Sequence, residues 1–364
     1  MRWIDHAIWW HVYPLGFCGA PIRDHDAAPA PRLRRLLNWL DYAVELGASG
    51  IALGPIFASV SHGYDTLDHF SIDPRLGDDA DFDALVAACR ERGLALMLDG
   101  VFNHVSTQHG LVGEESPMLR RSNGYLYTWE GHDNLVELDH TRDDVADWVT
   151  SIMLHWLRRG ISGWRLDVAY AVEPEFWRTV IDRVRAEFPD ALFLGEVIHG
   201  DYAGMAAAGH WDSVTAYELW KATWSSIKDV NFFELAHALG RHDTFSAHHV
   251  LNTFVGNHDV DRIASLVGAD GAALAASVLF ALYSIATRAV SREDSAVTSL
   301  FYAGVAGAVA ISLIGPFYWT QVQAADWFAL AALCVCGTLS HYFLIRAYGL
   351  LPATEVQPVT YFQL

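Results

Sequence analysis

The sequence predicts an α/β protein: a (β/α)₈ TIM-type barrel that stops before its eighth strand, followed by an all-α membrane segment of two to three helices. Three observations predict it. Strand-like and helix-like segments alternate over residues 1–271, polar side chains follow several of the strands, and residues 272–364 are apolar and nearly uncharged. Strands that alternate with helices pair in parallel through right-handed crossovers.

Seven short apolar runs predict the strands, at 7–13, 50–54, 94–101, 163–168, 191–197, 213–218 and 250–256. Helical spacing of apolar residues predicts the helices, at 32–46, 79–92, 143–159, 173–188 and 231–239. A stretch without periodicity predicts a short inserted loop domain at 105–140. Seven parallel strands also fit an open doubly wound sheet. Polar groups that must converge from several strand ends on one mouth favour the barrel.

Charge divides the chain near Gly271. The 364 residues include 24 Lys and Arg against 43 Asp and Glu, for a net charge of −19, and only Arg288, Arg292 and Arg346 supply positive charge beyond that point. An acidic front part lacks the basic surface that nucleic acids need, so no nucleic-acid partner is expected. The four cysteines are too few and too scattered for a disulfide framework.

The last 93 residues, 272–364, predict a membrane segment with helices at about 272–290, 296–319 and 327–349. The second and third apolar runs are long enough to span a bilayer, and a soluble core helix seldom lacks a polar face over such a length. The predicted partner of this segment is the lipid bilayer. The first six residues contain no apolar run that would make a cleavable signal peptide, which predicts a cytoplasmic barrel that is membrane-associated where the helices insert.

Four peptides place carboxylates or imidazoles at strand ends. They are Asp99-Gly-Val-Phe-Asn103-His104, Gly163-Trp-Arg165-Leu-Asp167, Gly195-Glu196-Val and Val255-Gly-Asn257-His258-Asp259. Arg165 and Asp167 are two residues apart on one strand, so their side chains face the same side. We expect the arginine to lower the pKa of Asp167 and keep it ionised, as a nucleophile requires. The alternative is a buried Arg–Asp pair that only supports the barrel.

In their order and in their residues, these peptides resemble the α-amylase family of glycoside hydrolases over roughly residues 3–270. The resemblance implies that Asp167 is the nucleophile, Glu196 the acid/base and Asp259 a third carboxylate that binds sugar hydroxyls. It implies a retaining mechanism, in which two such carboxyls stand about 5–5.5 Å apart, and an α-glucan or oligosaccharide substrate.

The resemblance also implies sugar-binding side chains, namely Tyr64, Asp65, His104, Arg165 and His258. Within His62-Gly-Tyr64-Asp65, the tyrosine matches the aromatic platform of the family, on which a sugar face stacks. Asp99 is expected to support His104 and Arg165 from beneath the site.

Calcium is left open by the resemblance. Asn103, a supporting residue, matches a position that ligates calcium in many α-amylases. The nearby carboxylates, Asp133, Glu137 and Asp139, are few, which favours a site that requires no cofactor.

Other hypotheses about the function remain open at this point. The catalytic residues are shared by hydrolases and transglycosylases. A membrane-tethered, non-catalytic amylase-like protein would also combine a barrel with membrane helices. The segments 281–288, 340–348 and 357–364 are similar to the drug/metabolite transporter superfamily, so a transporter fragment or a chimeric chain is a further hypothesis.

Overall fold

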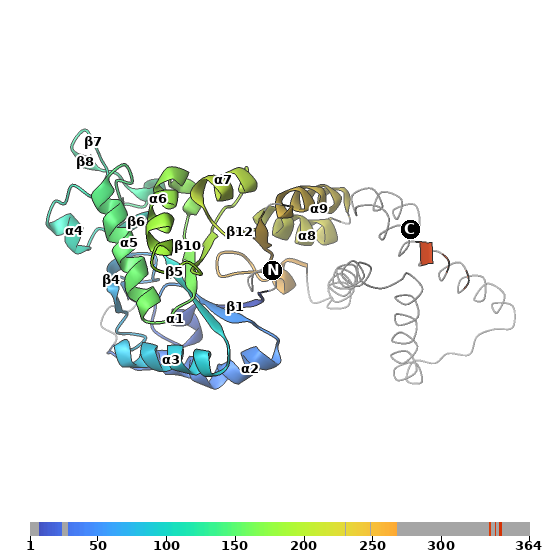
Figure 1. Cartoon of the computed structure of the whole chain (residues 1–364), viewed down its shortest axis with the longest axis horizontal. Coiled ribbons are helices and arrows are strands. Elements are labelled where there is room, and N and C mark those ends of the chain that lie inside the picture. Colours follow the sequence, from blue (N-terminus) through green and yellow to red (C-terminus); the bar gives the residue numbers. More distant parts are fainter. Residues whose placement is uncertain are drawn as a thin grey trace. The chain divides into compact units, whose positions relative to one another are not determined.

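The computed structural model describes residues 7–23, 28–229, 231–247 and 249–267, together with residues 335, 339, 342 and 343 (Figure 1). The chain divides into two compact units, Met1–Leu266 and Val267–Leu364. The elements that position the candidate site lie in the first unit, which is described here by itself.

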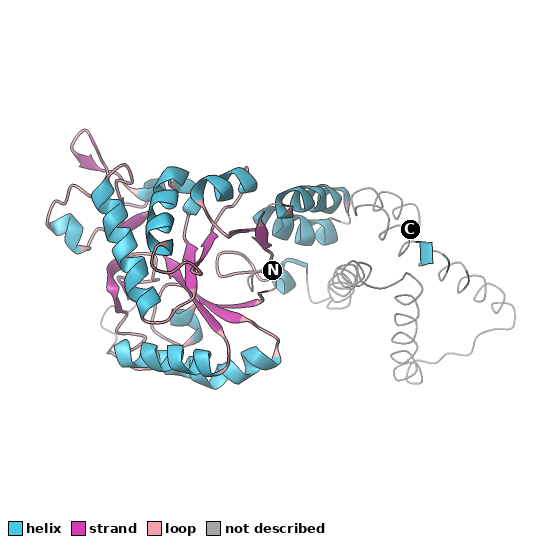
Figure 2. Ribbon diagram, in the orientation of Figure 1, coloured by secondary structure: helices cyan, strands magenta, loops and turns pink. Residues whose placement is uncertain are grey.

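A parallel sheet of seven strands forms the centre of this unit (Figure 2). Its order is β1 (Trp9–Val12), β2 (Gly50–Leu53), β5 (Ala95–Gly100), β10 (Gly163–Leu166), β11 (Leu192–Gly195), β12 (Ser213–Thr215) and β13 (Val250–Asn252). All seven expected strands are confirmed. The order follows the sequence without reversal, and every neighbouring pair is parallel. A doubly wound sheet reverses its order at a switch point, so the arrangement is that of a singly wound barrel.

Helices connect the strands. They are α1 (Pro14–Phe17), η2 (Arg32–Trp39), α2 (Leu40–Glu45), α3 (Asp79–Glu91), α5 (Asp143–Arg158), η4 (Ala169–Ala171), α6 (Pro174–Arg185), α7 (Tyr202–Gly209), α8 (Tyr217–Lys228), α9 (Phe233–Ser246) and α10 (Ile263–Val267). The expected helix 32–46 begins as a 3₁₀ helix, in which the buried Leu33 and Leu36 match a repeat of three residues. Helix α3 begins at a capping box in which Asp78 and Asp81 satisfy each other's backbone N–H groups.

The predicted end of the sixth strand was wrong, and two of the later helices were not expected. The sixth strand ends at Thr215 and does not reach Glu218, because helix α8 begins at Tyr217. Aromatic residues at 217, 220 and 224 recur at three- and four-residue spacing, which is the helical signal that sequence reasoning passed over. Helix α7 was not expected either.

The insertion after β5, where a loop domain was expected at 105–140, is built from short elements. They are β6 (His104–Ser106), α4 (Gly110–Gly113), β7 (Arg121–Ser122), β8 (Tyr125–Leu126), η3 (Trp129–Gly131) and β9 (Leu135–Glu137), with β6 antiparallel to β9. A second hairpin, β3 (Phe57–Ser59) and β4 (Thr66–Ile72), follows β2 and carries the loop around Tyr64.

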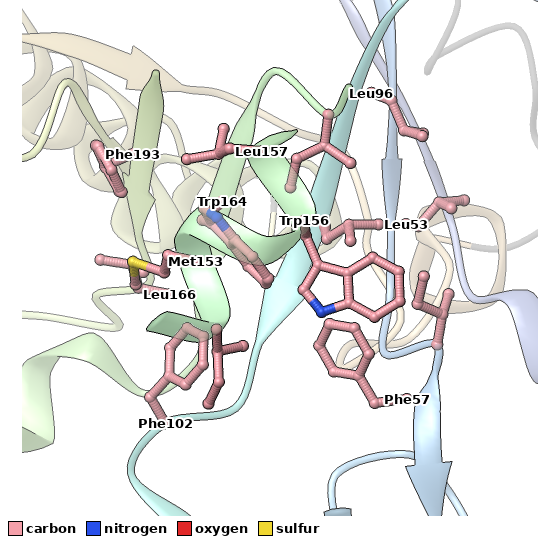
Figure 3. Close-up of a cluster of buried hydrophobic side chains, with 14 of the residues drawn as sticks. Leu53, Phe57, Leu96, Phe102, Met153, Trp156, Leu157, Trp164, Leu166 and Phe193 are labelled. Atoms are coloured by element: carbon pink, nitrogen blue, oxygen red, sulfur yellow. The ribbon is translucent and has the colours of Figure 1, made fainter. Parts of the chain in front are cut away.

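The larger core lies between the sheet and its helices (Figure 3). Trp156 of α5 packs against Phe57 with ring centroids 5.1 Å apart, and Trp164 of β10 packs against Phe102 at 5.5 Å. Each of these four side chains is at most 1% exposed. Full burial of one large apolar side chain contributes roughly 1.5–3 kcal/mol, so this cluster fixes the position of β10.

The other face of the sheet carries a smaller apolar cluster of Ala52, Met97, Leu192 and Leu194. Side chains alternate between the two faces of a strand. Asp99 is two residues after Met97, and Arg165 pairs in register with both Asp99 and Leu194. The inner face therefore changes from apolar to charged toward the carboxyl ends of its strands.

Several expectations concern residues outside the described part of the chain. An eighth strand would follow α10, and the three membrane helices expected from 272 onward lie almost entirely among residues that the structure does not describe. No helix among the described residues combines the length and apolar character needed to cross a bilayer.

Candidate active site

The carboxyl ends of β5, β10 and β11 place three carboxylates together. Leu166 pairs in register with Gly195, so the residues that follow them, Asp167 and Glu196, leave neighbouring strands at the same level. Asp99 lies one strand away on β5, opposite Arg165. Gly195 is needed here because a Cβ at this position would approach the ring of Trp211 to 2.5 Å.

Arg165 is the centre of the site. Its Nη1 donates to both Asp99 oxygens at 2.7 Å and to Asp167 Oδ1 at 3.1 Å. Its Nη2 lies 2.6 Å from Glu196 Oε1 and 3.6 Å from Asp259 Oδ2. The side chains of Arg165, Asp99, Asp167 and Glu196 are at most 8% exposed, whereas that of Asp259 is 43% exposed. One guanidinium thus gathers four carboxylates from four strand ends.

The electrostatics of Asp167 differ from the expectation. Burial raises the pKa of Asp167 well above its usual range; Arg165 opposes this, and the charge of Glu196 adds to it. Arg165 lowers this pKa as predicted, but the expectation that it keeps Asp167 ionised was wrong, because desolvation and like charges outweigh one guanidinium shared among four carboxylates. Burial likewise raises the pKa of Asp99, and it raises that of Asp259 to about 6.

Asp167 is held through one oxygen. Arg165 donates to Oδ1. Within the described part of the chain, no hydrogen-bond donor reaches Oδ2. An anchored carboxylate with one unbound oxygen has the geometry that nucleophilic attack needs.

Glu196 forms an ion pair with Arg165 and accepts two hydrogen bonds. The N–H of Val168 donates to Oε2 at 2.9 Å, and the Tyr217 hydroxyl donates to Oε1 at 3.0 Å. Val168 has φ 42° and ψ 40°, the left-handed region that a β-branched residue rarely adopts. This strained turn directs a backbone N–H from beside Asp167 toward Glu196.

His258 is enclosed by aromatic rings. It stacks on Tyr64, with centroids 5.5 Å apart and 6° between the planes, and on Tyr13 at 6.2 Å, while His11 meets it edge-on at 4.8 Å. Its Nε2 contacts the Tyr64 hydroxyl and lies 3.2 Å from Asp259 Oδ1. Burial, with Arg165 adding to it, lowers the pKa of His258 to about 2, so the imidazole is neutral. The segment that follows β13 therefore contacts β1 at the site.

The remaining expected residues line the loops around Arg165. The Tyr64 hydroxyl donates to Asp99 at 2.9 Å, and His104 Nε2 lies 3.0 Å from the Tyr64 carbonyl oxygen. Asp99 supports Arg165 as expected, whereas His104 is held by Tyr64 and Asn103. Asp65 is 1% exposed and accepts from the Ser61 N–H at 3.0 Å, so here it shapes the loop that carries Tyr64.

The structure gives no support to a calcium site at Asn103. Its amide nitrogen faces His104 Nδ1 at 3.2 Å, and Glu137 is bound to Arg120 at 2.7 Å. Among the described residues, no group of three or more His, Cys, Asp or Glu side chains is arranged to hold a metal ion.

Sequence reasoning missed two polar residues of the site. Tyr217 and Asn257 face each other, with the asparagine amide donating to the phenol oxygen at 2.8 Å. Tyr217 follows the sixth strand within Thr215-Ala-Tyr217, and Asn257 lies inside a quoted peptide without having received a role. A correct boundary for the sixth strand would have placed the tyrosine at a strand end.

Two cavities lie at the opposite, amino-terminal edge of the sheet. One of about 830 Å³ is lined by Ser49, Ala95 and Ser162, and one of about 580 Å³ by Asp212 and Val250. Ligands of parallel α/β folds bind at the carboxyl ends of the strands. Because the carboxylate cluster stands at that end, we place the candidate active site there.

The family model for the catalytic domain of α-amylase matches residues 23–118 and 119–290, which is more than half of the chain. The chain belongs to the α-amylase family. The match runs past Gly271 and includes the first apolar run of the tail. It covers the strand ends that carry the carboxylate cluster.

The curated relatives of this chain have names that describe enzymes acting on α-glucans. A cyclomaltodextrinase from Geobacillus thermopakistaniensis is 29% identical over 74% of this chain and 52% of its own length. An intracellular maltogenic amylase from Bacillus subtilis is 33% identical over 54% of this chain and 39% of its own. Neopullulanase 2 from Thermoactinomyces vulgaris is 28% identical over 88% of this chain and 60% of its own. The chain thus spans about half the length of these relatives.

Solved structures support the fold. Cyclic alpha-maltosyl-(1→6)-maltose hydrolase from Arthrobacter globiformis, in complex with maltose, matches with a TM-score of 0.66 at 24% identity, over 75% of this chain and 70% of that one. A cyclomaltodextrinase structure matches with a TM-score of 0.65 at 26% identity, over 76% of this chain and 54% of that one.

Proposed function

We propose that this chain is a retaining α-glycoside hydrolase or transglycosylase that acts on α-glucan oligosaccharides such as maltodextrins. The observation that carries the proposal is the single guanidinium of Arg165, which contacts Asp167 and Glu196 and has Asp259 beside it. Acetal cleavage with retention needs two protein groups beside the same sugar: a carboxylate that acts as the nucleophile and a carboxyl that donates a proton. The relatives' names support an α-glucan substrate.

In the proposed mechanism, Asp167 attacks the anomeric carbon while Glu196 gives its proton to the glycosidic oxygen. The C–O bond breaks, the leaving sugar departs with that proton, and a covalent bond to Asp167 forms. Water, or a sugar hydroxyl in transglycosylation, then loses its proton to Glu196 and displaces Asp167. Asp259 and His258 bind hydroxyls of the same sugar, and Tyr64 provides the ring beneath it. We propose that the site requires no cofactor.

This proposal concerns the barrel, residues 1–271, and does not depend on the role of residues 272–364. The alignment with neopullulanase 2 covers 88% of this chain, more than residues 1–271 can supply, which favours continued relationship to the family over a transporter fragment. A membrane-tethered, non-catalytic protein is a less favoured alternative, because all three carboxylates are present and gathered. A bilayer partner for residues 272–364 and a cytoplasmic location for the barrel stay hypotheses.

The test is turnover by the whole chain. It should release reducing sugar from maltotriose and from a cyclomaltodextrin, and NMR of the first product should show the α-anomer. Asp167→Asn should lower kcat by roughly 10⁴-fold, because it removes the nucleophile without changing its size. Asp147→Asn, on an exposed face of α5 where Asp147 pairs with Arg183, is the matched control. Equal activity of the Asp167 and Asp147 variants would refute the assignment.

A further inference from the structure

Tyr217, the first residue of α8, lies between two of the site carboxylates. Its hydroxyl oxygen is 3.0 Å from Glu196 Oε1 and 3.4 Å from Asp259 Oδ2. Tyr217 is 7% exposed and Glu196 5%, so bulk water does not replace these contacts. Burial of the hydroxyl, with the charges of both carboxylates adding to it, raises the pKa of Tyr217, so the phenol keeps its proton at neutral pH.

Asn257 fixes the direction of these hydrogen bonds. The backbone N–H of Asp259 donates to Asn257 Oδ1 at 2.9 Å, which makes that end of the amide the acceptor. The other end, Nδ2, therefore faces Tyr217 and donates to its oxygen at 2.8 Å. A phenol has one proton, and with its oxygen already accepting, that proton goes to Glu196 or to Asp259.

The two states of Glu196 require different partners. The partners of this side chain are the guanidinium of Arg165 and two hydrogen-bond donors, the Val168 N–H and the Tyr217 hydroxyl, which suits a carboxylate without a proton. When Glu196 carries the proton that it delivers to substrate, it no longer needs the second of these donors. The Tyr217 proton then has Asp259 as its remaining acceptor.

We propose that Tyr217 is a positioning residue that shares its one proton between Glu196 and Asp259, donating to Glu196 when that carboxylate is ionised and to Asp259 when Glu196 is protonated. This inference rests on the proposed function, since it concerns the same site. It links the protonation of the acid/base residue to the carboxylate that holds the sugar. Among the described residues, the charged and titratable groups that face Glu196 and Asp259, besides Tyr217, are Asp99, Arg165, Asp167, Tyr170 and His258.

The test is infrared spectroscopy of the whole chain as a function of pH, which needs no turnover. The carbonyl band of protonated Glu196 is assigned by its loss in Glu196→Gln. In Tyr217→Phe, this band should persist to a pH about one unit higher than in the natural protein, because a hydrogen bond to a charged group is worth about that much. Tyr202→Phe is the matched control: Tyr202 is 2% exposed, and among the described residues its hydroxyl bonds only to the backbone of Ile198 and Glu218.

A second variant keeps the hydroxyl and the shape of the ring. A fluorinated tyrosine at position 217 is a stronger donor, so the Glu196 band should disappear at a lower pH than in the natural protein. Opposite shifts in the two variants would establish that the Tyr217 hydroxyl donates to ionised Glu196, as the shared proton requires. A Glu196 band that titrates at the same pH in all three proteins would overturn the inference.

Activity separates this inference from the proposed function. Opposite infrared shifts without turnover of any α-glucan would support the shared proton and contradict the proposed function. Turnover that depends on Asp167, together with a Glu196 infrared band that does not shift, would support the proposed function and contradict the shared proton.

Discussion

Two parts of the first unit differ in how they are packed. From β1 to β11, the helices bury whole faces: α5 buries eight of its 16 residues. From β12 to α10, burial becomes thinner along the chain: β12 is fully buried and α8 buries four of its 12 residues, but α9 buries only Ala238 of its 14 residues, and no residue of β13 is fully buried. We call these the packed part (β1–β11) and the thin part (β12–α10).

The active site crosses this boundary. Asp99, Asp167 and Glu196 belong to the packed part, whereas His258 and Asp259 follow β13 in the thin part. The residues proposed to carry out bond cleavage are therefore held by a rigid core, and those proposed to grip the sugar are held mainly by contacts within the site. Such a division predicts that damage to the thin part affects substrate binding before it affects the stability of the fold.

The largest difference in stability is expected between alanine variants of two leucines, one in each part. Leu98 of β5 is fully buried, and Leu251 of β13 is partly exposed. Leu98→Ala should lower the free energy of unfolding by about 3–5 kcal/mol, because it leaves a cavity in a core that cannot collapse, and Leu251→Ala by about 1 kcal/mol. Urea unfolding followed by tryptophan fluorescence measures both. Equal losses would mean that the two parts are packed alike.

Matched ion pairs sharpen the comparison. Arg75 and Asp73 are at most 8% exposed and lie 2.6 Å apart, whereas Arg241 and Glu218, which join α9 to α8, are 38% and 28% exposed. Arg75→Ala should cost about 3–5 kcal/mol, because it leaves a buried carboxylate without its partner. Arg241→Ala should cost at most about 1 kcal/mol, since solvent screens that pair. A large loss in the Arg241 variant would show that the thin part is stabilised by charge.

The smallest expected effect is a pH dependence of the free energy of unfolding that arises from Asp259. Its pKa in the folded chain is raised to about 6 from 3.8, so the folded form binds a proton between these pH values that the unfolded chain does not. Stability therefore rises as pH falls through this window and is reduced above it. Because the side chain is 43% exposed, we expect only about 1 kcal/mol.

Asp259→Asn should remove this rise and be more stable than the natural protein at pH 7 by that amount. Urea midpoints at pH 7 and at pH 4 test it, with Asp147→Asn as the exposed control. Parallel pH curves for the natural protein and the Asp259 variant would contradict the assignment.

The prediction of Arg165 and Asp167 shows both the strength and the limit of sequence reasoning. Their spacing on one strand correctly predicted a shared face. The direction of the Asp167 pKa was wrong, because it depends on how many carboxylates share the guanidinium and on how deeply all of them are buried. Spacing along one strand carries no information about groups that arrive from three other strands.

The sequence by itself determined the seven parallel strands and the strand ends that carry Asp99, Asp167, Glu196 and Asp259. It could do so because strands covered on both faces appear as short continuous apolar runs, and because parallel strands end at a common edge. Only the tertiary structure decided the contacts of Tyr217 and Asn257, the left-handed backbone of Val168 and the rings around His258. These depend on the distances between segments that are far apart in the chain, which no local pattern of residues records.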